Sequence, residues 1–153
     1  MTSKLFLNTE GYQVSFEMKT IPDLPDEFEV TISFRLDPRL DNVTFTSTPS
    51  ALPFKELQAL ADYFTPHIEL LKSNPNGDSD TFVPLDLQFQ LQAFAGEVRS
   101  PDDGEFTLQF MINMGKPEKG STSVYVGGEG VVTLEEINRF LASVKRLLAD
   151  TSH

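Results

Sequence analysis

The segment Phe28-Glu-Val-Thr-Ile-Ser-Phe-Arg-Leu36 decides the fold class, because apolar and polar residues alternate along its whole length. The same alternation recurs in Leu85-Asp-Leu-Gln-Phe-Gln-Leu-Gln92 and in Phe106-Thr-Leu-Gln-Phe110. Successive side chains of a strand point to opposite faces of its sheet. The pattern therefore predicts antiparallel strands with one face in a core and the other in water.

Two helix-like stretches each follow a group of these strands. We expect Ser50 to cap the first helix and Pro66 to kink it, or to restart it with Thr65 as a second cap. The capping box Thr133-Leu-Glu-Glu136 opens the second helix, which carries a complete apolar stripe. The expected strands cover residues 12–18, 28–36, 43–46, 82–94, 96–99, 105–114 and 122–126.

These elements predict an α+β fold, mainly an antiparallel sheet or sandwich with two principal helices, in which the strands-then-helix order occurs twice. The chain of 153 residues is long enough to bury a core of its own. We expect a single domain over residues 1–153, with possible structural halves at about 10–73 and 82–150.

Charge and composition exclude several classes of function. The formal net charge is -11, so nucleic acid and anionic membranes are repelled and a basic protein partner is favoured. The chain has no cysteine, which excludes disulfides and thiolate chemistry. We find neither a signal-peptide core nor an apolar run of membrane-spanning length, and expect a cytoplasmic protein.

The sequence contains parts of known catalytic and cofactor-binding motifs, but none of these motifs is complete. Gly115–Thr122 has the glycine spacing of a phosphate-binding loop but lacks its lysine, so we expect a hairpin loop. Gly127-Gly128-Glu129-Gly130 is expected to be a flexible turn before the last helix, and Asp103-Gly104 a tight hairpin turn.

Metal binding has equally little support. Asn74–Asp80 places oxygen-bearing side chains at alternate positions, as the first part of a calcium-binding EF-hand loop does. The twelfth position of such a loop requires a glutamate, but here it would be Leu85. His67 is expected on a helix surface, and His153 is the terminal residue. We therefore predict no catalytic, cofactor-binding or metal-binding residue and no cofactor.

Binding of another protein is the function that the polar and acidic residues favour. Polar side chains are expected along one side of a strand at Asp86, Gln88, Gln90 and Gln92, where the neutral glutamines form a surface that is inexpensive to desolvate. Acidic residues speed the encounter with a basic enzyme. The predicted partner-binding residues are Asp23, Asp26, Glu27, Glu29, Asp102, Asp103 and Glu105.

The order of elements and the apolar signatures resemble the WapI-family immunity proteins of bacterial contact-dependent and polymorphic toxin systems. The resemblance covers most of the chain and contains no functional motif from which a binding residue could be transferred. It implies a small cytoplasmic protein that occludes a cognate toxin, often a basic nuclease, in a tight non-covalent complex. The segments that carry it are Tyr12–Met18, Phe28–Leu36, Leu52–Leu60, Leu85–Phe89, Gly96–Val98 and Val132–Leu141.

Two other classes of function stay open at this point. One is a small-molecule-binding or metal-binding domain, or an unrecognised hydrolase, with its site at Gly115–Thr122 or Asn74–Asp80. The other is a homo-oligomeric structural protein joined through a sheet edge or a helix face.

Overall fold

Strands dominate the structure, and a helix follows each of two groups of strands. The computed structural model describes residues 2–115 and 123–151. The elements in these residues are β1 (Thr2–Asn8), β2 (Tyr12–Ile21), β3 (Leu24–Leu36), β4 (Thr44–Thr46), β5 (Ser50–Pro53), α1 (Phe54–Ser73), β6 (Phe89–Ser100), β7 (Asp103–Asn113), β8 (Tyr125–Thr133) and α2 (Leu134–Thr151).

The strands form two antiparallel sheets. In the first, the order is β1-β2-β3-β4, and β5 pairs with the first part of β3. In the second, the order is β6-β7-β8. The predicted α+β fold with antiparallel sheets, two principal helices and a repeated strands-then-helix order is confirmed.

The two sheets face each other and enclose an aromatic core. Phe16 of β2 lies 5.8 Å, between ring centroids, from both Phe89 of β6 and Phe110 of β7. Phe140 of α2 reaches the same ring at 5.9 Å. Each of these phenylalanines is almost completely buried. Burial of one such side chain contributes about 1.5–3 kcal/mol, so this cluster is a major source of stability.

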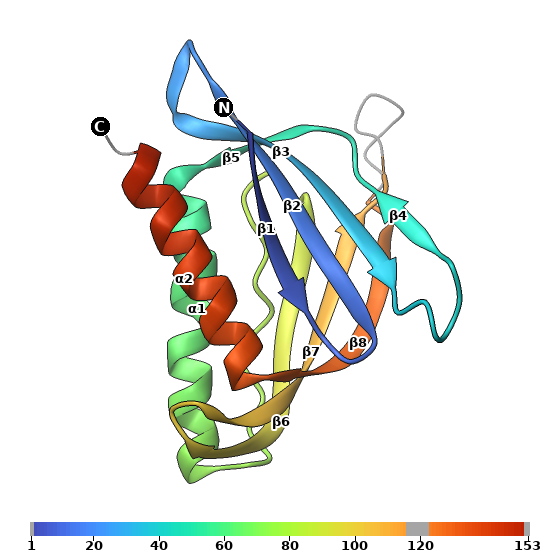
Figure 1. Cartoon of the computed structure of the whole chain (residues 1–153), viewed down its shortest axis with the longest axis vertical. Coiled ribbons are helices and arrows are strands. Elements are labelled where there is room, and N and C mark those ends of the chain that lie inside the picture. Colours follow the sequence, from blue (N-terminus) through green and yellow to red (C-terminus); the bar gives the residue numbers. More distant parts are fainter. Residues whose placement is uncertain (1, 116–122, 152–153) are drawn as a thin grey trace.

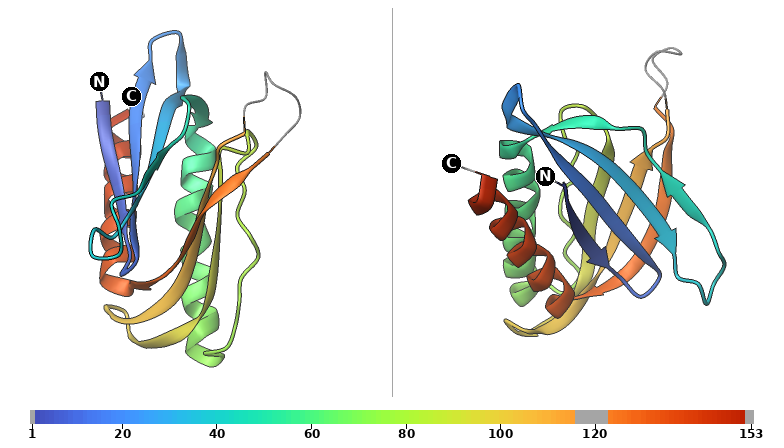
Figure 2. Two further views of the ribbon diagram at one scale, coloured as in Figure 1. Left: turned by 90° about the vertical axis from the view of Figure 1, so that its right-hand side faces the viewer. Right: turned by 45° about the horizontal axis from the view of Figure 1, so that its top comes forward.

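The helices lie together on one side of the paired sheets (Figure 1, Figure 2). α1 contacts β6, α2 contacts β1, and the helices contact each other. They therefore close the side of the core where the edge strands β1 and β6 would otherwise face water. No helix in residues 2–115 and 123–151 has the length and apolar character needed to cross a membrane.

The sequence prediction is wrong for two segments, one of which is an unpredicted strand and the other a loop that was predicted to be a strand. β1 was not predicted, because its outward Phe6 is apolar and hides the alternation of the buried Leu5 and Leu7. Conversely, residues 83–88 are not a strand. Phe82 pairs with Leu91, so the chain between them has to turn back, and Leu85 is left 74% exposed.

The glycine segment near the end of the chain is part of β8, and its prediction as a flexible turn is wrong. A Cβ atom on Gly127 would lie 1.9 Å from the carbonyl oxygen of Phe110, and one on Gly130 would lie 2.7 Å from Thr9 Oγ1. These glycines therefore allow β8 to approach β7 and the β1–β2 turn. Close approach of two backbones explains them better than turn geometry does.

The first helix begins later than predicted and continues through its proline. Ser50 pairs with Val30 in β5, so it does not cap α1, which begins at Phe54 after an extended Pro53. α1 is one helix over Phe54–Ser73 with Pro66 inside it, so the predicted restart at Thr65 is wrong. Buried residues on both sides of Pro66 pack into the same core, which holds the helix together.

The second helix begins as predicted, and the hairpin turn is shifted. Thr133 Oγ1 accepts a hydrogen bond of 3.2 Å from the Glu136 amide and caps α2. The turn between β6 and β7 is formed by Pro101 and Asp102, because Asp103 already pairs with Ser100. Most of the predicted loop Gly115–Thr122 lies outside the described residues.

Candidate functional site

The predicted partner-binding acids lie at two ends of the molecule. Asp102 is beside the start of α2, because Asn138 donates hydrogen bonds to Asp102 Oδ1 and to the Pro101 carbonyl. Glu27 lines a hollow that also includes Asp150 at the end of α2. Asn138 and Asp150 are separated by about 18 Å of helix. Figure 1 shows the β6–β7 hairpin at the bottom and the β2–β3 hairpin at the top.

In the β6–β7 hairpin, one arginine engages the acidic side chains. Arg99 contacts Asp103 at 3.0 Å, Glu105 at 2.9 Å and Glu97 at 3.0 Å. The hydrogen bond from Arg99 lowers the pKa of Asp103 below its usual value. The hairpin acids therefore share one partner within the chain, and Arg99 offsets one of their negative charges.

At the other end, Asp26 and Glu27 are not paired. The described part of the chain offers neither carboxylate a hydrogen-bonding partner or an ion pair. Both residues lie on β3 and line a groove with a volume of about 570 Å³, which we call the β3–α1 groove. Its lining consists of Asp26, Glu27, Pro53, Phe54, Lys55 and Leu85.

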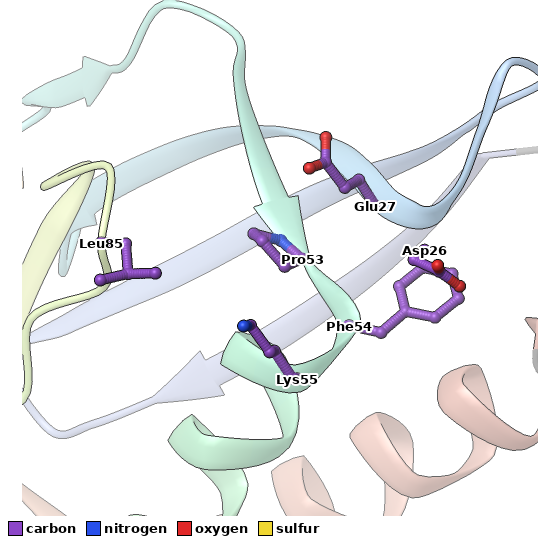
Figure 3. A pocket seen from close by; sticks show the side chains of 6 residues that line it. All are labelled: Asp26, Glu27, Pro53, Phe54, Lys55 and Leu85. Carbon is purple, nitrogen blue, oxygen red and sulfur yellow. The ribbon is translucent and has the colours of Figure 1, made fainter.

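The groove is formed where β3, the start of α1 and the 83–88 loop meet (Figure 3). β5 positions Phe54 by pairing with β3, and the Phe54 ring packs on Phe28 with a centroid distance of 4.4 Å. Glu56 Oε1 accepts a hydrogen bond of 3.2 Å from the Leu85 amide, which ties the loop to α1. The groove therefore has an ordered apolar floor beneath free carboxylates.

Exposed apolar side chains lie on both sides of Phe54. Leu85 lines the β3–α1 groove, and Leu24, which is 47% exposed, lines a neighbouring hollow of about 250 Å³. The two hollows share Glu27 and Phe54. Sequence reasoning missed this apolar component, because the alternation around Leu85 predicted burial. Pro84, directly before it, was the available signal of a turn.

The two remaining predicted acids, Asp23 and Glu29, do not line the groove. Asp23 lies in the turn between β2 and β3, and Glu29 lies on the outer side of β3 opposite Lys19. The structure therefore brings Asp26 and Glu27 together in a groove, leaves Asp23 and Glu29 beside it, and separates all four from the hairpin.

His67 is fully buried, so its prediction as a surface side chain is wrong. Its Nδ1 lies 2.7 Å from Ser79 Oγ, and its Nε2 lies 2.8 Å from the Phe94 carbonyl oxygen. Nε2–H donates to that carbonyl, which leaves Nδ1 to accept from the serine hydroxyl. Burial lowers the pKa of the imidazole. The neutral ring thus joins α1 to the 74–80 loop and β6.

The 74–80 loop has a structural role along β6. The Ser79 amide donates to the Ala93 carbonyl at 3.0 Å, and Asp78 Oδ1 accepts from the Ala95 amide at 3.2 Å. Asn74 Oδ1 accepts from the Asn76 amide. Within residues 2–115 and 123–151, no three His, Asp or Glu side chains are grouped so that they could hold a metal ion.

The predicted neutral strand face is only partly present. Gln90 and Gln92 lie on the outer side of β6, with Met111 and Gln109 as their neighbours on β7. Gln88 instead turns inward, is 6% exposed and donates its side-chain amide to the Ala51 carbonyl. Asp86 is in the loop, because strand pairing resumes only at Phe89.

The chain matches no protein-family model, and no curated protein is similar to it.

Proposed function

We propose that this protein binds a basic protein partner without catalysing a reaction, and that it acts as an immunity protein that occludes a toxin domain. The observation that carries the proposal is the β3–α1 groove, which is lined by Asp26 and Glu27, without a partner among the described residues, and by the exposed Leu85. Exposed apolar area supplies binding energy, and unpaired acids steer a cation toward it. The resemblance to WapI-family proteins agrees with this function.

The chemistry of the groove suits a lysine or arginine side chain of the partner. Such a side chain places its apolar stem along Leu85 and Phe54 while its charged group reaches the carboxylates. Lys55 is the cation that the chain itself contributes to this lining. It forms no ion pair with another described residue, so two carboxylates are left for an incoming charge.

The experiment that tests the proposal is affinity capture from a lysate of the source organism with three forms of the protein. These are the wild type, a groove variant with Asp26→Asn and Glu27→Gln, and a control with Asp103→Asn and Glu105→Gln. Both variants lose two negative charges, so any difference between them reflects position and not net charge. Bound proteins are eluted with increasing salt and identified by mass spectrometry.

We expect the wild type and the control to retain one basic protein in stoichiometric amount. The groove variant should bind it roughly tenfold more slowly at low salt, because rim charges act mainly on the association rate. Equal retention by all three forms would remove the groove from the interface. Recovery of no specific protein would contradict the proposal itself.

The immunity function has a second test in cells. Expression of the recovered partner alone should stop growth, and co-expression of this protein should restore it. A partner that is harmless when expressed alone would leave protein binding established and would refute neutralisation of a toxin.

A further inference from the structure

Most of the strand edges in the two sheets are protected from further pairing. β1 lies against α2, and β5 leads directly into α1, while the Ala51 carbonyl in β5 accepts from Gln88. β4 is only three residues long. The edge of β6 is covered by the preceding segment, with hydrogen bonds of 2.7 and 3.0 Å between Phe82 and Leu91. Proteins generally protect edges in these ways, because an open edge pairs with other chains.

The register of β8 shows which of its main-chain groups face outward. The Met114 amide donates to the Val124 carbonyl, and the pairing with β7 continues from there without a shift. Because hydrogen-bonded and non-hydrogen-bonded pairs alternate in an antiparallel ladder, even-numbered residues of β8 bond to β7. Odd-numbered residues point their amide and carbonyl groups away, and the Val131 carbonyl does accept from the Glu10 amide outside the sheet.

The outward groups of Tyr125, Gly127 and Glu129 have no such partner in residues 2–115 and 123–151. None of the described residues forms a main-chain or side-chain hydrogen bond to them. Gly127 and Glu129 are exposed, and the strand contains neither proline nor lysine to discourage pairing. β8 therefore presents a strand edge of about five residues whose outward main-chain groups form no hydrogen bond to a described residue, and Gly11 of the β1–β2 turn approaches the Glu129 carbonyl at one end of it.

We propose that the edge of β8 over Tyr125–Glu129 accepts an extended segment of the partner as a fourth strand of the second sheet. This inference rests on the proposed function for the existence of a partner and adds the mode of recognition. Main-chain hydrogen bonds supply affinity in such β-augmentation, and side chains on alternate residues supply specificity. Glu129 at the edge and the net charge of -11 favour a basic segment. A second copy of this chain would bring another eleven negative charges and is disfavoured.

The test uses NMR of the isotopically labelled full chain with two blocked peptides of eight residues. One alternates valine and lysine, and the other alternates valine and threonine. A third peptide carries N-methyl groups on alternate residues of the first, which removes the donors along one edge. The protein variants are Glu129→Pro, which removes an outward amide donor, and Glu129→Gln, which removes the charge and keeps the donor.

We expect both alternating peptides to shift the amide signals of residues 125–129, with tighter binding for the lysine peptide. Glu129→Pro or N-methylation should weaken binding about tenfold, because each removes main-chain hydrogen bonds, whereas Glu129→Gln should retain the uncharged peptide fully. The N-methylated peptide tests the wild-type protein, so a folding defect in Glu129→Pro cannot decide the result.

Several outcomes would overturn the edge proposal. They are no binding, binding that N-methylation does not weaken, and concentration-dependent shifts of residues 125–129 without peptide, which indicate self-association. Shifts confined to the β3–α1 groove with the lysine peptide would also overturn it while leaving the proposed function intact. Edge binding of the threonine peptide alone would preserve the edge proposal and contradict the preference for a basic partner.

Discussion

The β6–β7 hairpin and the β3–α1 groove contain the same type of residue in opposite circumstances. In the hairpin, Arg99 contacts three carboxylates, and Asn138 of α2 donates to a fourth acidic side chain. In the groove, Asp26 and Glu27 have no partner in the described part of the chain and share the lining with an exposed leucine. An acid that is ion-paired within the fold already has a partner. An acid left free is available to a partner, so acidic composition alone does not locate a binding site.

The end of α1 next to the hairpin resembles the hairpin in this respect, because its buried histidine is hydrogen-bonded within the fold. His67 bonds to Ser79 and Phe94 and packs edge-on to Phe106 at 4.8 Å. The hairpin end is therefore a structural region, and the groove end is the candidate binding region. The following predictions test that division.

The largest effect should come from His67→Ala. It leaves a cavity in the core and two polar groups without their partner, so we expect a loss of about 3 kcal/mol in the free energy of unfolding. Urea denaturation measures the loss, with the exposed Gln58→Ala on the same helix as a control. A change below about 0.5 kcal/mol, which is normal for a surface position, would refute a structural role for His67.

The next largest effect should be on binding and should come from Leu85→Lys. This change removes an exposed apolar contact and adds a cation to the groove that Asp26 and Glu27 line, so the Kd for the captured partner should rise about thirtyfold, or about 2 kcal/mol. Leu40→Lys is the matched control, because Leu40 is 66% exposed in the β3–β4 loop. Equal effects of the two variants, measured by calorimetry, would argue against the groove.

A smaller effect concerns the pH dependence of stability at His67. Burial lowers the pKa of the folded imidazole, so the unfolded chain binds the proton more readily as the pH falls. The stability contribution is complete above the unfolded pKa of about 6.5 and declines below it, by at most about 1.4 kcal/mol per pH unit. The wild type should therefore lose more stability between pH 7 and pH 5 than His67→Gln. Parallel curves for the two proteins would contradict this assignment.

The smallest effect should follow Arg99→Gln, which releases the hairpin acids. Because the pKa of Asp103 is lowered in the folded protein, its stabilising contribution is present above the unfolded pKa and is lost as the pH falls through the folded pKa. NMR titration should show that the pKa of Asp103 rises toward its ordinary value in the variant. Thermal unfolding should depend less on pH below about 4 than in the wild type. If the pKa of Asp103 is the same in the variant and the wild type, Arg99 does not form this ion pair in solution.

The sequence correctly predicted those elements for which the local pattern and the tertiary contacts favour the same secondary structure. The alternation of Phe28–Leu36 and the cap at Thr133 are local signals, and the corresponding strand and helix are present. The prediction failed where long-range pairing overrides the pattern. Residues 85–88 alternate perfectly, but the Phe82–Leu91 pairing forces a turn there. The glycines of β8 favour a turn locally, but they are required by the proximity of β7.

The candidate site was predictable only in part for the same reason. Composition identified both acidic segments, and the spacing of Arg99 and Asp103 across a hairpin could have indicated their pairing. The apolar side of the groove could not be inferred, because it depends on where the 83–88 loop meets α1. The open edge of β8 depends on which strands the remaining chain covers, and no local pattern carries that information.

The close contact between β7 and β8 also has an evolutionary consequence. At Gly127 even one methyl group would collide with the backbone of Phe110, whereas at Gly128 a Cβ atom would meet only the Phe34 ring, at an ordinary distance of 3.8 Å. These neighbouring glycines are therefore under unequal selection. Lineages that descend from this protein should keep the first and can exchange the second for alanine, so two residues that look equivalent in the sequence should diverge at very different rates.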